Sequence, residues 1–317
     1  MQYPVAKPLL VIVGPTAVGK TKIAIEIAKI LEGEIISADS RCFYRGMDIG
    51  TAKPSLQERA IIPHFMIDIV DPDEIVSLAI FQKMVLGIID NIHQRYHLPV
   101  LVGGTGQYIH AIIKDWNIPA QEPDIKLRNI LEEWAGEIGH LELYKKLSLI
   151  DPEAAISIDP RNLRRTIRAL EVNLKTGQKF SSQRKSGVPP FKIKMVGLML
   201  PRQQLFAIID RRIEQMIKAE WVEEVKGLIQ RFSADLPAFS AIGYHEIIQF
   251  LHGEISLEEA SILMKRKTRQ FVRRQSNWFK TNDPHIRWFD VQSASVQEIC
   301  DFVLSRDNWF TSYQVRK

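Results

Sequence analysis

The sequence has few cysteines and no long apolar run. Cys42 and Cys300 are its two cysteines among 317 residues, and they form no C-x-x-C pair. This argues against a disulfide framework and against a zinc module. No apolar stretch approaches the roughly 20 residues that a membrane helix needs. The N-terminal apolar run leads into a glycine loop rather than a cleavage site, so we expect a cytoplasmic protein with no membrane partner.

Low-complexity tracts and internal repeats are also lacking, and the composition is that of an ordinary globular protein, with 45% hydrophobic and 25% charged residues. The net charge of +5 conceals a strong segregation. Residues 161–195 carry ten basic side chains against one acid, and residues 265–280 carry seven against none. The remainder is therefore acidic, and two basic patches on an acidic protein indicate a polyanionic partner, with nucleic acid first.

Short apolar runs alternate with helical patterns through the first hundred residues. The strands that we expect are "LLVIV" (9–13), "EIIS" (34–37), "HFMIDIV" (64–70), "PVLVGG" (99–104), "KIKMVGLML" (192–200) and "HIRWFD" (285–290). Strands of this length separated by helices predict an α/β fold of the P-loop NTPase type, in which a parallel sheet has helices on both faces.

Strand signals stop for about 75 residues after Asp115, where three helical patterns follow one another. This predicts an inserted all-helical domain over residues 116–190, between a first core segment, 1–115, and a second, 191–317. The segment "TGQKFSSQRKSGVPPF" (176–191) is expected to be a mobile basic loop. One long helix is expected from Pro201 to about Phe232, with proline at a favoured first position.

A phosphate-binding loop follows the first strand. "GPTAVGKT" matches G-x-x-x-x-G-K-[ST] between a strand and a helix, the context that this motif requires. Backbone N–H groups and the helix N-terminus would hold the anion, while Lys20 would contact the outer phosphate and the Thr21 hydroxyl would bind Mg²⁺. The residues assigned to this loop are Gly14, Pro15, Thr16, Ala17, Val18, Gly19, Lys20 and Thr21.

An acidic residue is missing where most P-loop proteins have one. "PVLVGG" ends in two glycines, and Asp68 in "HFMIDIV" is only a weak substitute. Asp39 is better placed, because it follows the strand after the loop helix and should face the bound phosphates. Metal support, a general base towards an acceptor, and a structural cap in the turn-like "SADSR" all remain open for it. The loop alone permits a nucleoside triphosphate as well as a diphosphate.

Six distinctive blocks follow one another from Leu9 to about Asp290. They are "GPTAVGKT", "ISADSRCFYRGMDIGTAKP", "PVLVGGTGQYI", "DPEAAISIDPRNLRRTIRALEV", "AIGYHEI" and "TRQFVRRQSNWF". In these blocks and in their order the sequence resembles the tRNA dimethylallyltransferase family, in its short bacterial form without a zinc finger. The resemblance implies that the loop holds dimethylallyl diphosphate, and that N6 of the adenosine 3′ of the tRNA anticodon attacks its first isoprenoid carbon.

The resemblance also implies roles for individual residues. Asp39 is the expected base for N6, and Thr105 its orienting neighbour. Lys20, Thr21 with Mg²⁺, and Arg212 form the expected pyrophosphate clamp, and the sequence leaves open whether Arg212 or the adjacent Arg211 makes the contact. The residues expected to bind tRNA are Asp39, Ser40, Arg41, Cys42, Arg128, Arg164, Arg165, Arg168, Gly243 and Tyr244. His64 is expected only to pack.

Two basic helix faces should grip the RNA. Helical spacing places Arg161, Arg164, Arg165 and Arg168 opposite an apolar stripe of Leu163, Ile167, Leu170 and Leu174. The same spacing places Arg266, Arg269 and Arg273 opposite a buried face with Met264, Phe271 and Trp278. Phe271, Trp278 and Phe279 are therefore expected in the core rather than as base-stacking platforms. Tyr244, on a glycine turn, is expected on the RNA side.

Three other functions are compatible with parts of the pattern. An isoprenyltransferase that acts on free adenine nucleotides would share the loop and the aspartate, but would have little use for the basic insertion. A P-loop kinase for a small metabolite would need the missing acid. A non-catalytic RNA-binding protein would not need Lys20, Thr21 and Asp39 together. No oligomerisation signal is present, so we expect a monomer.

Overall fold

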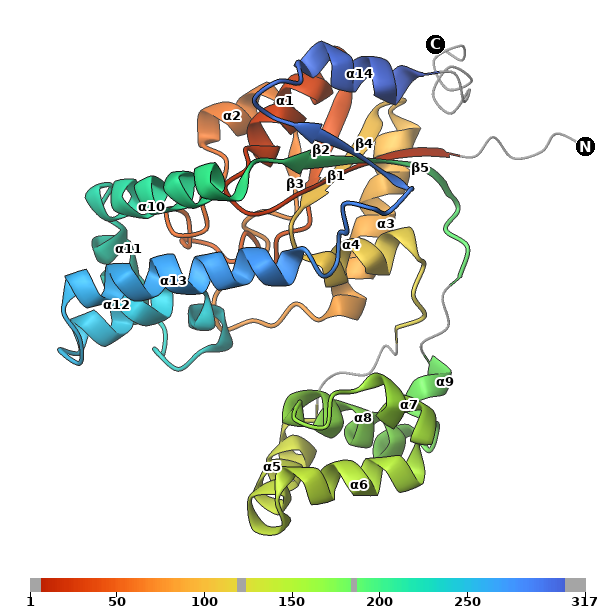
Figure 1. Ribbon diagram of the computed structural model, residues 1–317, viewed down its shortest axis with the longest axis vertical. Coiled ribbons are helices and arrows are strands. Elements are labelled where there is room, and N and C mark those ends of the chain that lie inside the picture. The colour runs from red at the N-terminus through yellow and green to blue at the C-terminus, as the bar shows by residue number, and fades with distance from the viewer. Residues whose placement is uncertain (1–6, 119–123, 184–186, 306–317) are drawn as a thin grey trace, which may run out of the picture. The chain divides into compact units, whose positions relative to one another are not determined.

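The computed structural model describes residues 7–118, 124–183 and 187–305 (Figure 1). These divide into two compact units. The core unit comprises the described parts of 1–76, 81–113 and 189–317, and the helical unit comprises 77–80 with 114–188. The helical insertion expected at 116–190 thus corresponds closely to one of the two units.

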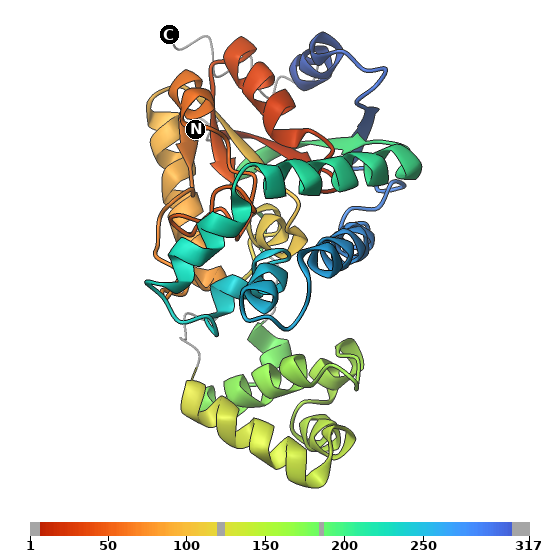
Figure 2. The same ribbon diagram turned by 90° about the vertical axis from the view of Figure 1, so that its left-hand side faces the viewer.

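A parallel six-stranded sheet forms the centre of the core unit, in the order β3-β2-β4-β1-β5-β6. The strands are β1 (Lys7–Val13), β2 (Gly33–Ser37), β3 (His64–Phe65), β4 (Leu98–Gly103), β5 (Phe191–Met199) and β6 (Ile286–Asp290). Helices lie on both sides of the sheet (Figure 2). The predicted α/β fold with a parallel sheet is confirmed, including the late strand β6.

The helices of the core unit connect and cover these strands. They are α1 (Lys20–Ile30), α2 (Leu56–Ile61), most of α3 (Leu78–Gln94), α4 (Gly106–Ile113), α10 (Arg202–Lys218), α11 (Trp221–Ile229), the 3₁₀ turn η1 (Pro237–Ser240), α12 (Tyr244–Leu251), α13 (Leu257–Gln275) and α14 (Val296–Leu304). Alternate residues of β1 pack on opposite faces: Leu10 and Ile12 join the cluster that contains α1, as period-2 burial requires. Because all strands are parallel, their carboxyl ends meet at one edge, where ligands bind in such sheets.

Two predicted elements differ from the structure. The strand expected at 64–70 ends after Phe65, because Met66 and Asp68 adopt positive φ angles of 63° and 55°. The helix expected from Pro201 to Phe232 is broken between α10 and α11, where Glu220 has a φ of 67°. A residue in the left-handed conformation ends a helix as well as a strand. Neither position carries a glycine, so the sequence does not predict the breaks.

The helical unit has a small apolar core of its own. Its helices are α5 (Ile125–Ile138), α6 (His140–Ile150), α7 (Pro152–Ser157), α8 (Leu163–Thr176) and α9 (Phe180–Gln183). Leu131, Leu143, Leu147 and Leu170 are buried together there. In the segment expected to be a basic loop, α9 is helical, and residues 184–186 lie outside the described part. The N–H of Gly187 donates to the carbonyl of Asp115 at 3.0 Å, which joins the two chain ends of this unit.

No helix in the ranges 7–118, 124–183 and 187–305 combines the length and the apolar character needed to cross a membrane.

Candidate functional site

The phosphate loop has the backbone form that its sequence predicts. Gly14 packs directly against β5, where a Cβ would lie 2.5 Å from the carbonyl oxygen of Leu198, and Gly19 has a φ of 92° just before α1. The ammonium of Lys20 donates to the loop carbonyls of Gly14 at 3.0 Å and Pro15 at 2.8 Å. The lysine therefore already lies over the loop that would hold an anion.

Two cations are buried beside this loop. Burial lowers the pKa of Lys20 to about 8, against an opposing effect of Asp39. Burial likewise lowers the pKa of Arg212, again opposed by Asp39. Because one carboxylate faces two desolvated cations, the site favours binding of a further negative charge.

A hollow of about 300 Å³, the phosphate pocket, opens beside the loop. Its walls include Lys20, Thr21, Asp39 and Arg212, whereas Arg211 is exposed to solvent. The geometry thus places Arg212, and not its neighbour, beside the phosphate loop. His64 also lines this pocket. Its Nδ1 lies 2.7 Å from the carbonyl oxygen of Ile62, while its buried Nε2 has no partner among the described residues.

A second hollow of about 320 Å³, the apolar pocket, adjoins the first. Thr105 lies in its wall with several apolar side chains, which are those of Ile209, Ile213, Met216, Trp221, Met264 and Phe271. The two pockets share five lining residues, which are Thr16, Ala17, Asp39, Thr51 and Arg212. Asp39 and Arg212 therefore lie where a group in one pocket would meet a group in the other.

Asp39 follows β2, as predicted, and its two carboxylate oxygens differ. Oδ1 accepts from the backbone N–H of Arg41 at 3.0 Å, an Asx turn that gives Asp39 the capping role left open by the sequence. Oδ2 has no hydrogen-bond partner among the described residues. One oxygen thus holds the turn, and the other is available to accept a proton in the pocket.

Asp68 is not placed to hold a metal. Its carboxylate pairs with Lys53 and Arg59, each at 2.5 Å. The described residues contain no group of three or more His, Cys, Asp or Glu side chains that could hold a metal ion. A Mg²⁺ ion keeps several waters and needs one or two protein ligands besides its phosphates, and the Thr21 hydroxyl in the phosphate pocket fits that requirement.

Three residues that follow β2 and are expected to contact tRNA have different environments in the structure. Ser40 lines the apolar pocket, as an RNA-facing residue would. Arg41 lines the same pocket, and its guanidinium also donates to the carbonyls of Pro237 and Ala238 and to the hydroxyl of Ser240, which anchors η1. Cys42 is buried in the wall of the phosphate pocket, and burial raises the pKa of its thiol. Its expected contact with the RNA surface is therefore not supported.

Tyr244 was expected on the RNA side, and that prediction is wrong. The residue is fully buried at the start of α12, with its ring edge-on to Trp221 at 5.8 Å. Gly243 is buried as well, and a Cβ there would lie 1.9 Å from the ring of Trp221. The glycine is needed for this close packing, and not to present an aromatic side chain to solvent.

The hydroxyl of Tyr244 takes part in a set of hydrogen bonds that holds a loop of the site, and the sequence does not predict it. It donates to Glu224 of α11 at 2.6 Å. The same carboxylate accepts from the backbone N–H groups of Asp48 at 2.9 Å and Ile49 at 2.7 Å. Glu224 and Tyr244 thus hold the loop that supplies Thr51 to both pockets. Glu224 lies in an ordinary amphipathic helix, so no local pattern distinguishes it.

We expect Tyr244→Phe to lower the free energy of unfolding by about 1–3 kcal/mol, the cost of removing a hydrogen bond to a charged partner. Chemical denaturation would measure this loss. The affinity for tRNA should stay unchanged, because the side chain does not reach the surface. If the variant kept its native stability and bound tRNA more weakly, Tyr244 would have to contact the RNA after all.

The basic face of α8 is smaller than its sequence predicts. Buried Glu171 pairs with Arg128 at 2.9 Å and with Arg168 at 2.6 Å. Arg164 is exposed and Arg165 half-exposed, and neither pairs with a carboxylate among the described residues. Arg164 and Arg165 therefore remain the best candidates for phosphate contacts, and Arg128 and Arg168 mainly hold the helical unit together.

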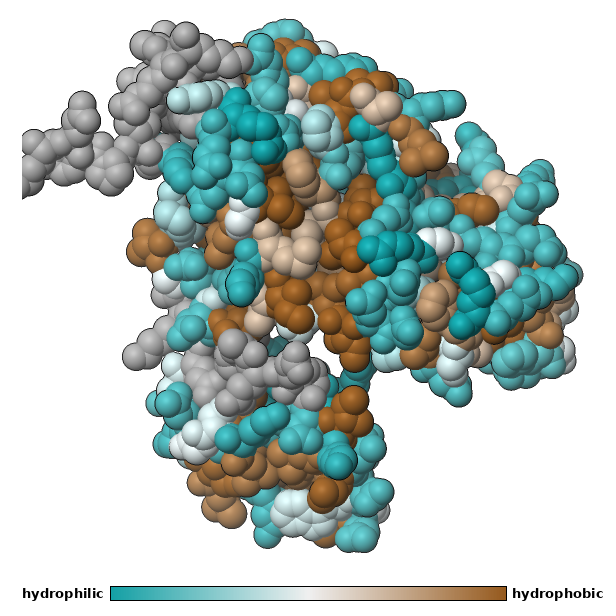
Figure 3. All heavy atoms as spheres, turned by 180° about the vertical axis from the view of Figure 1, so that it is seen from behind, coloured by the Kyte–Doolittle hydropathy of each residue, from teal (hydrophilic) through white to brown (hydrophobic). Residues whose placement is uncertain are grey.

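Apolar side chains also reach the surface of the helical unit. Leu174, expected in the apolar stripe, is 56% exposed, and Ile156 of α7 is 88% exposed. Figure 3, which shows the molecule from behind, has brown apolar side chains gathered at the surface of the helical unit. The helical unit thus offers both basic and apolar side chains to a partner.

The aromatic residues near the end of α13 have different environments. Met264 and Phe279 are buried, as expected, and Phe271 lines the apolar pocket. Trp278 is 36% exposed, contrary to the prediction, because α13 ends at Gln275 and the helical spacing no longer applies. Arg269 pairs with Asp210, which leaves Arg266 and Arg273 exposed on this helix.

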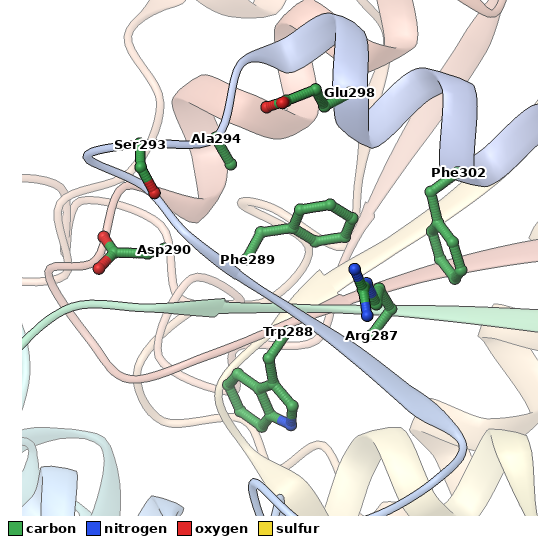
Figure 4. Close-up of a pocket in the computed structure, with 8 residues that line it drawn as sticks. All are labelled: Arg287, Trp288, Phe289, Asp290, Ser293, Ala294, Glu298 and Phe302. Carbon is green, nitrogen blue, oxygen red and sulfur yellow. The ribbon is translucent and has the colours of Figure 1, made fainter.

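Another hollow lies at the edge strand β6, beside α14 (Figure 4). Phe289 and Phe302 approach each other edge-on there at 5.8 Å, with the guanidinium of Arg287 over Phe289. Trp288 points to the other side of the strand, against Gly197. None of the residues that the sequence assigns to a site lies in this hollow.

Comparison with known proteins identifies relatives over nearly the whole chain. The family model "IPP transferase" matches residues 42–282. A "tRNA dimethylallyltransferase" of Roseiflexus sp. (strain RS-1) is 49% identical over 292 residues, which cover 92% of this chain and 95% of the relative. One of Thermomicrobium roseum is 43% identical over 293 residues, which cover 92% and 89%.

Solved structures agree with these relatives. A full-length tRNA isopentenylpyrophosphate transferase from Bacillus halodurans is 40% identical and superposes with a TM-score of 0.71, covering 98% of this chain and 99% of that one. A eukaryotic dimethylallyltransferase, described as acting on tRNA, is 28% identical with a TM-score of 0.81, covering 94% and 79%.

Proposed function

The chain belongs to the IPP transferase family, and on this premise we propose that it transfers a dimethylallyl group from dimethylallyl diphosphate to tRNA. The acceptor is N6 of the adenosine 3′ of the anticodon, and pyrophosphate is the second product. The observation that best supports this reaction is that Asp39 and Arg212 line both adjoining pockets. One pocket suits a diphosphate, and the other suits an apolar chain and a base.

The reaction needs a stabilised leaving group. The diphosphate lies in the phosphate pocket, where Lys20, Arg212 and the loop N–H groups neutralise the charge that develops on it. A Mg²⁺ ion held through Thr21 would supply further positive charge to the diphosphate oxygens. As the bond between C1 and oxygen breaks, its electron pair leaves with pyrophosphate.

The reaction also needs proton removal from the acceptor. The N6 lone pair forms the new bond to C1, and Oδ2 of Asp39 takes the proton that N6 loses. The Thr105 hydroxyl, in the apolar pocket, orients N6. An adenine stacked in an RNA loop has to swing out to reach this position.

No group for water activation is needed, and packing explains why the last residue of β4, Gly103, carries no side chain. A Cβ on Gly103 would lie 2.7 Å from the carbonyl oxygen of Ala38, so the backbone after β2 leaves no room for a side chain there. This fits the proposed transfer to an acceptor, which needs no water-activating acid at this position.

The proposal is tested by incubating the protein with dimethylallyl diphosphate and either unmodified tRNA or AMP. Transfer to tRNA but not to AMP, without added ATP, is expected. Transfer to AMP alone would identify an isoprenyltransferase for free nucleotides, and ATP-dependent phosphorylation would identify a small-metabolite kinase. The expectations of a monomeric state and a cytoplasmic location stay predictions.

Binding of tRNA should weaken steeply with salt, because cationic side chains displace counterions from phosphates. Replacing both Arg164 and Arg165 with alanine should lower the slope of log K against log salt by about two, roughly one for each phosphate contact. Filter binding over a salt series would measure it. Lys145→Ala is the matched control, since this exposed lysine of the same unit already pairs with Glu142 at 2.6 Å. An unchanged slope in the double variant would show that these two arginines of α8 do not contact RNA phosphates.

A further inference from the structure

Gln275, the last residue of α13, reaches across the core unit to two distant segments. Its Oε1 accepts from the backbone N–H of Thr16 in the phosphate loop at 2.9 Å. Its Nε2 donates to the carbonyl of Gly104, just after β4, at 3.1 Å. Gln275 is only 5% exposed, so its two hydrogen bonds are shielded from bulk water.

The site is built for an amide. A Cβ on Gly104 would lie 2.1 Å from Nε2 of Gln275, so the glycine leaves the space that the amide fills. The N–H of Thr16 is a donor and faces the amide oxygen, and the carbonyl of Gly104 is an acceptor and faces the amide nitrogen. A carboxylate offers no donor, and a methionine side chain of similar length offers no donor and only a weak acceptor.

Both partners of Gln275 belong to the site. Thr16 lines both pockets, and Gly104 directly precedes Thr105 of the apolar pocket. On the other side, Gln275 directly follows Arg274, which is exposed and also lines the apolar pocket. The amide therefore fixes the diphosphate loop relative to the turn that carries Thr105, from the end of a basic helix.

We propose that Gln275 is a positioning residue for the transfer reaction: its amide holds the phosphate loop and the β4–α4 turn in register, so that the loop is preformed for the diphosphate. The expected effect on transfer kinetics rests on the proposed function. The expected effect on the affinity of the loop for a diphosphate does not, because binding can be measured without any transfer. Without the amide, the diphosphate itself would have to order the phosphate loop on binding, and this would lower the affinity for the diphosphate.

We expect Gln275→Met to raise the KM for dimethylallyl diphosphate about tenfold and the Kd of magnesium pyrophosphate by the same factor, with the affinity for tRNA unchanged. Gln275→Glu should raise both further, because it places a carboxylate oxygen against the Gly104 carbonyl and adds negative charge near the diphosphate. Kinetics at saturating tRNA and titration calorimetry with pyrophosphate would measure the two constants. Gln270→Met, at an exposed position of the same helix, should change neither.

Gly104→Ala provides an independent variant with the glutamine intact, since its methyl group would displace the amide. It should reproduce the rise in both constants. Native pyrophosphate affinity in folded Gln275→Met and Gly104→Ala proteins would overturn the proposal, as would a parallel loss of tRNA affinity, which would indicate general damage to α13. Absence of transfer by the native protein, with pyrophosphate binding still weakened in the variants, would contradict the proposed function alone.

Discussion

Replacing Asp39 with asparagine is expected to lower kcat by about 100-fold or more, while tRNA still binds. Asparagine keeps an oxygen that can accept from the N–H of Arg41, so the Asx turn after β2 survives. What it loses is the carboxylate that takes the proton from N6 in the proposed reaction. Single-turnover transfer to tRNA at saturating dimethylallyl diphosphate would measure the chemical step.

Asp39→Ala separates the two roles of this residue, because alanine lacks both the proton acceptor and the turn bond. If the carboxylate acts as a base, both variants are slow, and alanine additionally lowers stability. If the asparagine variant turned over at the native rate and only the alanine variant were slow, the turn would be the sole function of Asp39.

Replacing Lys20 with methionine is expected to lower kcat/KM for dimethylallyl diphosphate by about 100- to 1000-fold, the usual cost of removing a preorganised group from developing charge. Methionine approximates the length of the lysine stem and removes the ammonium. The loop carbonyls of Gly14 and Pro15 would then lose their hydrogen bonds as well. Steady-state kinetics at fixed tRNA would measure the loss. A decrease confined to tRNA affinity would contradict the assignment of Lys20 to the leaving group.

The pH dependence gives a second measure of Lys20. Because its pKa is lowered to about 8 in the free protein, the ammonium is lost as pH rises through 8, and pyrophosphate affinity should fall there. Between about 8 and 10.5 the unfolded chain binds more protons than the folded one, so the contribution of Lys20 to the free energy of unfolding rises with pH. Lys20→Arg stays charged over this range and should lose both effects. The same pH profile in the arginine variant would assign the titration to another group.

The architecture and the phosphate site follow from local patterns in the sequence. A buried strand, a glycine loop and a helix lie within about 25 residues of one another, so the motif at 14–21 specifies its own geometry. Asp39 is placed by the general rule that loops at the carboxyl ends of parallel strands share one edge of the sheet. Arg212 is distinguished from Arg211 only by the face of α10 on which it lies, which the structure establishes.

The errors arise where distant segments meet. Tyr244 follows a glycine, as a surface turn residue would, but Trp221 from another helix fills the space beside it. The charges of Arg128 and Arg168 are compensated by Glu171, the single acid in the basic stretch 161–195, and counting charges does not show that it is buried between them. Gln275 and Glu224 act through backbone groups more than 170 residues away, and backbone partners leave no trace in a residue pattern.

The hydrogen bond between Gly187 and Asp115 bears on the history of the chain. The helical unit leaves and re-enters the core through two points that this bond joins, which is the arrangement left when one gene segment is inserted into another with little disturbance to either. Closely spaced chain ends are also what allows one domain to interrupt another without disturbing its fold.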